Sequence, residues 1–236
     1  MCGRFSLTTA IDRLLPRLRG ELPPGLAGHY APRPQIRPGE PLLIQRQQQG
    51  RLEVGFALWG LLPAWVKDPD EPRSPSQRPV HRPIHARGET VAEKASFRGP
   101  WRHHRCLIPA DAFFEKGQRI ARRDRAPFWL AGLWERWLGA DGSQLDSCCI
   151  LTTRPNALIA PIHQRMPVLI PDGVEAAWLA PAHGAELRAL EPLLEPWDPA
   201  GWLIEPIAAG PSAAKAPAAC PAAVDSPQLS LSLEPP

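Results

Sequence analysis

The sequence lacks the patterns that mark metal-binding, secreted and membrane proteins. Its five cysteines form no Cys-x-x-Cys pair and no cysteine–histidine spacing that would bind zinc, so we expect neither a metal nor another cofactor. The first residues contain no apolar segment typical of a signal peptide, and no stretch is long and apolar enough to span a bilayer. We therefore expect a soluble, cytoplasmic protein with reduced cysteines and no membrane partner.

Proline is present in excess, at 31 of 236 residues, which is about 13% against about 5% in average proteins. Because proline restricts the backbone and removes a hydrogen-bond donor, we expect short strands and few long helices. The expected strands cover residues 41–46, 52–60, 105–110, 127–137, 147–153 and 165–170. The expected helices cover residues 9–19, 89–94, 174–179 and 185–194, and residues 118–124 are expected to form a basic turn. Strands and helices do not alternate regularly, which favours a β-rich α+β fold over a parallel sheet.

Charge is unevenly distributed along the chain, although the net charge is only +3. Residues 1–125 contain 22 Lys and Arg against 12 Asp and Glu, which gives +10, whereas residues 171–236 contain 2 against 9, which gives −7. A basic first half favours binding of a polyanion. The alternative is that these arginines are scattered over an ordinary surface.

Composition also predicts the domain organisation. Residues 1–207 are expected to form one domain, because they contain the apolar segments, and residues 208–236 form an Ala/Pro/Ser-rich tail that either extends away or docks on the domain. Residues 67–84 are rich in proline and arginine and poor in apolar residues, which indicates a mobile surface loop.

The first five residues, Met1-Cys-Gly-Arg-Phe5, contain the strongest candidate nucleophile. If Met1 is removed, Cys2 carries a free α-amine and a thiol on adjacent carbons. An α-amine has an ordinary pKa of about 7.7–8.0, so much of it is neutral near pH 7 and can attack an aldehyde, after which the thiol can close a five-membered ring. The thiolate alone could instead act in acyl transfer. Cys2 could also be a small apolar residue at an ordinary chain end.

Glu115 and His163 are candidates for proton transfer. Glu115 follows two phenylalanines at the end of an expected buried strand, where a carboxyl group can act as a general acid or base. His163 lies at the edge of an apolar segment and could move a proton near neutral pH. The alternatives are an exposed glutamate paired with Lys116 and a structural histidine in a turn.

Arginines and tryptophans provide candidates for nucleic-acid binding. Arg87 and Arg165 could bind phosphate with two hydrogen bonds each, or could form surface ion pairs. Trp59 and Trp65 flank a Gly/Pro-containing loop and could stack on a base, whereas tryptophans within the expected strands are more typical of a core.

Seven segments, taken in order, resemble the SRAP family, the SOS response-associated peptidase domain that shields abasic sites in single-stranded DNA. The segments are Met1–Phe5, Ala31-Pro32, Trp59-Gly-Leu-Leu-Pro63, Ala86-Arg-Gly-Glu-Thr90 with Glu93-Lys94, Arg105–Asp111 with Phe114-Glu115, Leu151-Thr-Thr153 and Ile162–Val168. Each segment alone is weak evidence, but their order and spacing over residues 1–180 are specific.

The resemblance implies a fold and a function. The fold would be a barrel-like core of twisted, antiparallel sheets, with short peripheral helices and a basic groove. After autoproteolytic or aminopeptidase-dependent removal of Met1, Cys2 would form a thiazolidine with the ring-opened aldehyde of an abasic site. The catalytic set would be Cys2, Glu115, His163 and His85, and the DNA-binding set would be Arg4, Trp59, Trp65, Arg87, Thr152 and Arg165. The partner would be abasic single-stranded DNA bound by a monomer, associated with the bacterial nucleoid.

The sequence departs from the family pattern at four places. His85 stands where the family has an asparagine, and Lys116 stands where it has a tryptophan. Residues 27–29 replace an Arg-Tyr-Asn motif, and residues 213–216 retain little of a Val-Asn motif. The alternatives to a crosslinking protein are therefore an N-terminal-nucleophile cysteine peptidase or amidohydrolase, and a non-catalytic single-stranded DNA-binding paralogue.

Overall fold

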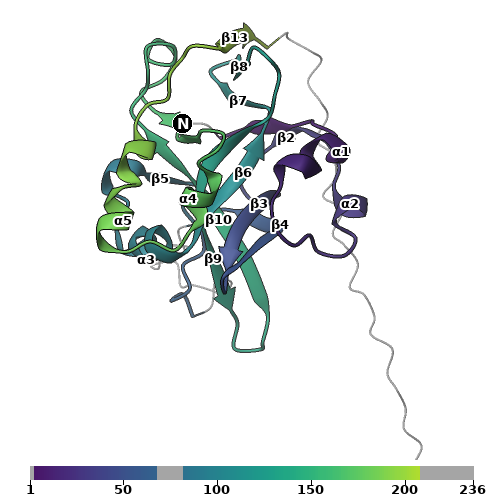
Figure 1. The fold of residues 1–236 in the computed structure, drawn as a ribbon, viewed down its shortest axis with the longest axis vertical. Helices are drawn as coiled ribbons and strands as arrows, with labels where there is room; N and C mark the ends of the chain where they lie inside the picture. Colours follow the sequence, from purple (N-terminus) through teal and green to yellow (C-terminus); the bar gives the residue numbers. More distant parts are fainter. Residues whose placement is uncertain (1–2, 68–81, 208–236) are drawn as a thin grey trace, which may run out of the picture.

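The computed structural model describes residues 3–67 and 82–207 and shows a β-rich protein with short helices (Figure 1). The strands are β1 (Phe5–Leu7), β2 (Arg33–Ile36), β3 (Pro41–Gln48), β4 (Arg51–Trp59), β5 (His85–Arg87), β6 (Arg105–Ala110), β7 (Ala112–Glu115), β8 (Gln118–Arg122), β9 (Phe128–Leu138), β10 (Gln144–Thr153), β11 (Met166–Pro167), β12 (Leu169–Ile170) and β13 (Trp202–Pro206). The α-helices are α1 (Ile11–Leu14), α2 (Leu26–His29), α3 (Ala95–His103), α4 (Glu175–Leu179) and α5 (Gly184–Arg188), with 3-10 turns η1 (Leu15–Arg17), η2 (Gly88–Thr90) and η3 (Glu191–Leu194). Most of the expected loop 67–84 and all of the tail 208–236 lie outside the described residues.

Five strands close into a barrel. β10 pairs with β4, β4 with β3, β3 with β6, β6 with β9, and β9 with β10. Closure leaves the ring without free edges. The expected barrel-like core is therefore confirmed, with one correction to its antiparallel pairing. β10 pairs with β4 in parallel, because a closed ring of five strands cannot alternate in direction at every pair.

Three strands of the barrel wall, β6, β9 and β10, are buried on both faces along most of their length, and their alternate residues divide between two apolar clusters. In β10, Cys148 and Ile150 belong to one cluster, and Cys149 and Leu151 belong to the other. The first cluster contains residues from all five ring strands, so it fills the barrel interior. The second contains residues from α3 and α4, with Leu187 of α5 packed against it, and lies on the outside. A period of two with apolar residues on both sides is typical of a strand between two packed layers.

Gly132 in β9 makes this close packing possible. A Cβ atom at this position would lie 2.7 Å from Sγ of Cys106, 2.9 Å from Cδ1 of Ile108 and 3.2 Å from the carbonyl oxygen of Cys149. We expect Gly132→Ala to lower the free energy of unfolding by about 1–3 kcal/mol, because the core has no room for the methyl group. Urea denaturation measures this change. Gly99→Ala, at an open position in α3, is the control, and an equal or smaller loss in Gly132→Ala would contradict the packing argument.

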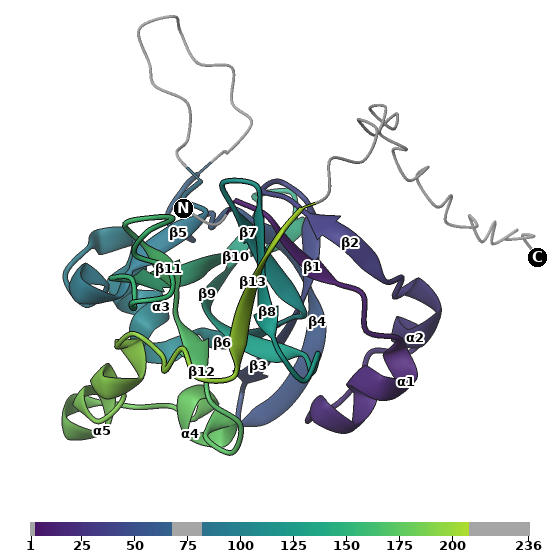
Figure 2. The same cartoon turned by 90° about the horizontal axis from the view of Figure 1, so that it is seen from above.

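A second, five-stranded sheet packs against the barrel in the order β13-β8-β7-β1-β2 (Figure 2). β7 and β8 form a hairpin whose two turn residues, Lys116 and Gly117, have φ values of 43° and 76°. Two positive φ values are typical of the tight turn that fits the twist of paired strands. Lys116 therefore occupies a turn directly after Glu115.

Helices cover opposite sides of the molecule. α3, α4 and α5 lie together on one side of the barrel, whereas α1 and α2 lie on the other side (Figures 1 and 2). Arg105 fastens the first group to β6: its guanidinium donates hydrogen bonds to the carbonyl oxygens of Trp101, Arg102, Trp178 and Ala180. α3 has nine residues, and none of the helices in the described part of the chain is long and apolar enough to cross a membrane.

Two sequence-based expectations about secondary structure are wrong. Residues 118–122 form β8 rather than a basic turn, because they pair with β7 and β13 on either side and bury Ile120 and Ala121, while the flanking arginines stay partly exposed. The helix expected over residues 89–94 begins only at Ala95, where α3 starts, and η2 precedes it. The Thr90–Glu93 spacing therefore belongs to a turn.

Candidate active site

A carboxylate and an imidazole meet at the end of β7. Nε2 of His163 lies 3.6 Å from Oε1 of Glu115, and the side chains are only 21% and 11% exposed. The structure thus brings together two of the residues expected to transfer protons, from positions 48 residues apart in the sequence. A carboxylate beside an imidazole is an arrangement that can exchange a proton with a bound ligand.

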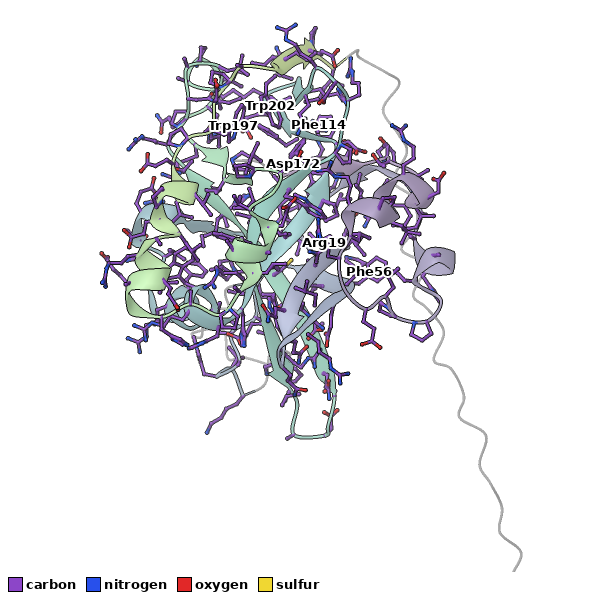
Figure 3. The ribbon with its side chains drawn as sticks, in the orientation of Figure 1. Arg19, Phe56, Phe114, Asp172, Trp197 and Trp202 are labelled. Carbon is purple, nitrogen blue, oxygen red and sulfur yellow. The ribbon has the colours of Figure 1, made fainter. Side chains whose placement is uncertain are left out.

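The segment that carries His163 is held by Asn156. The side-chain oxygen of Asn156 accepts a hydrogen bond from the N–H of Ile159 at 3.0 Å, and its amide nitrogen donates to the carbonyl oxygen of Trp197 at 2.9 Å. The indoles of Trp197 and Trp202, both labelled in Figure 3, contact each other with ring centroids 4.4 Å apart and an angle of 35° between their planes. The turn over residues 156–163 therefore has a fixed support. The sequence signal was an asparagine at a turn start, which commonly bonds to its own backbone.

β1 lies directly beside β7 and runs antiparallel to it. Phe5 is opposite Phe113, and the N–H of Phe114 donates to the carbonyl oxygen of Arg4 at 3.0 Å. The guanidinium of Arg4 lies over the ring of Phe114, 4.9 Å from its centroid. The N-terminal end of β1 and the C-terminal end of β7, which carries Glu115, therefore lie at the same edge of the sheet. Cys2 lies outside the described residues.

Asp111 anchors the other end of β1. Its carboxylate accepts hydrogen bonds from the N–H and the hydroxyl of Thr8, and from the N–H (2.9 Å) and the hydroxyl (2.6 Å) of Thr9. The hydroxyl of Tyr30 donates to the carbonyl oxygen of Thr9 at 2.6 Å. Burial, followed by the charge of Asp111, raises the pKa of Tyr30 to about 12, so its hydroxyl stays protonated as a donor. Sequence reasoning quoted Asp111 but missed this role, because its partners are about 100 residues away.

His85 and Arg87 lie on one face of β5. This strand pairs with β10 on the same side as β4, next to the point where the pairing with β4 ends. His85 is opposite Ile150, and Arg87 is opposite Thr152. The residue between them, Ala86, points to the outer cluster, so the two polar side chains point the other way. Arg87 is exposed, and His85 makes an edge contact with the indole of Trp59 at 6.1 Å.

Trp59 and Thr152 are buried, which corrects the expectation that they line a DNA strand. Trp59 is 0% exposed, and its indole N–H donates to the carbonyl oxygen of Ile84 at 2.9 Å. It packs between Phe5 and His85, so it supports β1 and β5 from below. A buried indole cannot stack on a base in this conformation. Trp65, by contrast, is 69% exposed.

Arg165 is engaged with protein groups rather than open to phosphate. Its Nη1 and Nη2 donate to the two carboxylate oxygens of Glu89 at 2.6 and 2.8 Å, and Nη2 also donates to the carbonyl oxygen of Thr152 at 2.6 Å. Its side chain is 19% exposed. Of the expected DNA-binding residues, Arg4, Trp65 and Arg87 remain accessible.

Three cysteines that could compete with Cys2 as nucleophiles are buried. Cys106, Cys148 and Cys149 are free thiols with 0% exposure. Burial raises the pKa of each thiol, so none is present as a thiolate at neutral pH. All three belong to the apolar clusters of the core.

Comparison with known proteins places the chain among related sequences. A model of the family described as SOS response associated peptidase (SRAP) matches residues 1–209. Abasic site processing protein YoqW of Bacillus subtilis is 35% identical over 210 residues, which cover 84% of this chain and 88% of that protein. Abasic site processing protein HMCES of Gallus gallus is 28% identical over 151 residues, which cover 51% of this chain and 43% of that protein.

Solved structures share the fold. A crystal structure of a protein from Bacteroides thetaiotaomicron has a TM-score of 0.72 and 24% identity, and covers 86% of this chain and 90% of that chain. A second, from Bordetella bronchiseptica, has a TM-score of 0.68 and 25% identity, and covers 87% and 99%. The barrel and its attached sheet are therefore a known architecture.

Proposed function

The chain belongs to the SOS response-associated peptidase (SRAP) family, and from that premise we propose that it processes abasic sites in DNA. In this proposal, the protein binds single-stranded DNA and, once Met1 is removed, Cys2 forms a thiazolidine with the ring-opened aldehyde of the abasic sugar. The names of its relatives support the substrate. The observation that carries the chemistry is the Glu115–His163 pair at the edge where β1 begins.

Chain geometry supports Cys2 as the nucleophile at this edge. The pairing of Phe5 with Phe113 continues through the hydrogen bond of Arg4 with Phe114, so the next position on β1, Gly3, corresponds to Glu115. Across a trans peptide bond, the Cα atoms of residues 2 and 3 are about 3.8 Å apart. A nucleophile on residue 2 is thus restricted to the neighbourhood of the carboxylate–imidazole pair.

The proposed reaction balances without an oxidant or a reductant. The neutral α-amine of Cys2 adds to the aldehyde carbon to give a carbinolamine, which loses one water and becomes an imine. The thiolate then adds to the imine carbon, and the nitrogen takes up a proton. One C–N and one C–S bond form, the C=O bond is lost, and one water leaves. An intact nucleotide offers no aldehyde, so the chemistry itself selects damage.

Side chains at the site have separate roles in this proposal. Glu115 donates the proton that lets the carbinolamine hydroxyl leave as water, and His163 assists opening of the sugar ring and reversal of the link. His85, in place of the asparagine found in the family, orients the sugar through its ring nitrogens. Arg4 and Arg87 contact flanking phosphates, and Trp65 stacks on a base, so that affinity does not depend on sequence.

The test is a crosslinking experiment with three oligonucleotides of the same sequence. One carries an abasic aldehyde, one carries the abasic site reduced to an alcohol, and one is intact. We expect a band of covalent adduct on a denaturing gel with the aldehyde alone, and a mass equal to protein without Met1 plus DNA minus one water. Binding of all three without an adduct would favour a non-catalytic binding protein, and amide hydrolysis without any DNA adduct would favour an N-terminal-nucleophile hydrolase. Either result overturns the proposal.

Glu115→Gln is expected to slow formation of the crosslink by on the order of 10²-fold, because the amide keeps the shape of the side chain but cannot donate the proton. Single-turnover crosslinking on gels measures the rate. Glu135→Gln is the matched control, because Glu135 also faces an imidazole, with 3.0 Å between its Oε1 and Nδ1 of His104, but on another part of the barrel. Equal rates for Glu115→Gln and the unmodified protein would remove Glu115 from the mechanism.

A further inference from the structure

An ion pair behind the site joins η2 to the segment that carries His163. Glu89 and Arg165 share two parallel hydrogen bonds of 2.6 and 2.8 Å, a geometry that fixes both side chains in one plane. Nη2 of Arg165 also donates to the carbonyl oxygen and to Oγ1 of Thr152, at 2.6 and 3.2 Å. Because Thr152 is a buried residue of the barrel strand β10, the pair is anchored to the barrel wall.

This ion pair persists over a wide pH range. The hydrogen bond from Arg165 is the largest influence on Glu89 and holds the pKa of its carboxyl group below the ordinary value. Glu89 therefore remains a carboxylate where a histidine titrates.

The backbone of Arg165 contacts the ring of His163 directly. The N–H of Arg165 donates to Nδ1 of His163 at 2.9 Å, and the carbonyl oxygen of Arg165 lies 3.1 Å from the same nitrogen. Nδ1 of the neutral ring can accept from the N–H, which places the ring proton on Nε2, and Nδ1 of the protonated ring can donate to the carbonyl oxygen. With Nδ1 held in this way, Nε2 faces Oε1 of Glu115 at 3.6 Å.

We propose that Glu89 is a positioning residue: by fixing Arg165, it holds His163 with Nε2 directed at Glu115 in both protonation states of the ring. This inference rests on the proposed function for its consequence in catalysis, but not for its structural content. In this inference, the role of Arg165 is to hold the ring of His163 through its backbone. Loss of the Glu89 carboxylate leaves the guanidinium held by Thr152 alone, so the side chain of Arg165 can reorient and its backbone holds Nδ1 less firmly.

Ring-nitrogen chemical shifts of ¹⁵N-labelled histidine test the structural part without DNA. His163→Ala identifies the His163 signals in the free protein. We expect the neutral ring of the unmodified protein to carry its proton on Nε2, and Glu89→Gln to give a mixture of both tautomers. Glu93→Gln removes the same charge from an exposed position four residues away and is expected to leave the spectrum unchanged. An unchanged His163 spectrum in Glu89→Gln overturns the inference.

Reversal of the DNA crosslink tests the catalytic part. We expect Glu89→Gln to reverse the crosslink more slowly, at a rate approaching that of His163→Ala. Adding Glu89→Gln to the His163→Ala variant is expected to change its rate by less than about twofold, because the effects of residues that act through one another are not additive. Independent, additive effects would overturn the inference even with an active protein. If no variant forms an adduct, the proposed function fails, and the ring-nitrogen signals still decide whether Glu89 positions His163.

Discussion

Cys2→Ala is expected to abolish the DNA adduct that survives a denaturing gel, yet to leave an adduct that borohydride can trap. Alanine at position 2 retains the free α-amine once Met1 is removed, so the imine still forms. It lacks the thiol that closes the ring, and an open imine is hydrolysed back to amine and aldehyde. The variant thus separates the two nucleophiles that the unmodified residue carries on adjacent carbons.

Abasic oligonucleotide incubated with and without borohydride, followed by electrophoresis, provides the measurement. The control is Cys220→Ser. Of the five cysteines in the sequence, three are buried in the described structure, which leaves Cys220 as the comparison for Cys2. The control is expected to crosslink like the unmodified protein. A stable adduct in Cys2→Ala without borohydride would exclude the thiazolidine, and absence of the trapped adduct would show that the α-amine does not reach the aldehyde.

Arg105→Leu is expected to lower the free energy of unfolding by about 3–5 kcal/mol, because it leaves several buried carbonyl oxygens without donors. Arg105 is 3% exposed, and its guanidinium carbon lies 5.7 and 6.0 Å from the ring centroids of Trp101 and Trp178, which also contact each other. Burial lowers its pKa to about 10, so it is still a cation at neutral pH. Its donors satisfy the C-terminal carbonyls of α3 and α4, which have no partner within their own helices.

Urea denaturation of Arg105→Leu, Arg105→Lys and Arg102→Leu measures this contribution. Lysine keeps the charge but cannot spread its donors over two helix ends, so an intermediate loss is expected. Arg102 is exposed on α3, and its replacement is expected to change stability by no more than about 0.5 kcal/mol. If Arg105→Leu is no worse than Arg102→Leu, the buried arginine is not what joins the helices to the barrel.

Local sequence patterns predicted those elements whose cause is local. The β3–β4 hairpin followed from two apolar segments separated by a polar, glycine-containing turn, and its register runs without interruption from Pro41–Leu58 to Gln48–Arg51. Strands β6, β9 and β10 were evident from continuous apolar residues. β8 was missed because its arginines outweigh Ile120 and Ala121 in the sequence, although the Lys116-Gly117 pair before it is a hairpin signal.

The sequence provided candidate site residues but not the contacts between them. Glu115 and His163 were expected from their chemistry, and the structure brings them together. Trp59 was expected to be accessible, because a sequence does not distinguish an indole that faces DNA from one that faces the core. Likewise, nothing near Arg165 in the sequence reveals that its charge is bound by Glu89, 76 residues earlier.

β4 and β5 follow one another along the same edge of β10, and this has a consequence for protein engineering. The chain leaves the barrel at Gly60, whose N–H donates to Cys148, and returns at Ile84, whose carbonyl oxygen accepts from Ile150. The N–H of Leu61 also donates to the carbonyl oxygen of Pro83 at 3.0 Å, so a hydrogen bond joins the segment that leaves the barrel to the segment that returns to it. Each doubling of an intervening loop costs only about 0.6 kcal/mol of closure entropy. We therefore expect that a foreign segment inserted at this junction, next to the exposed Trp65, leaves the strand pairing of the barrel intact.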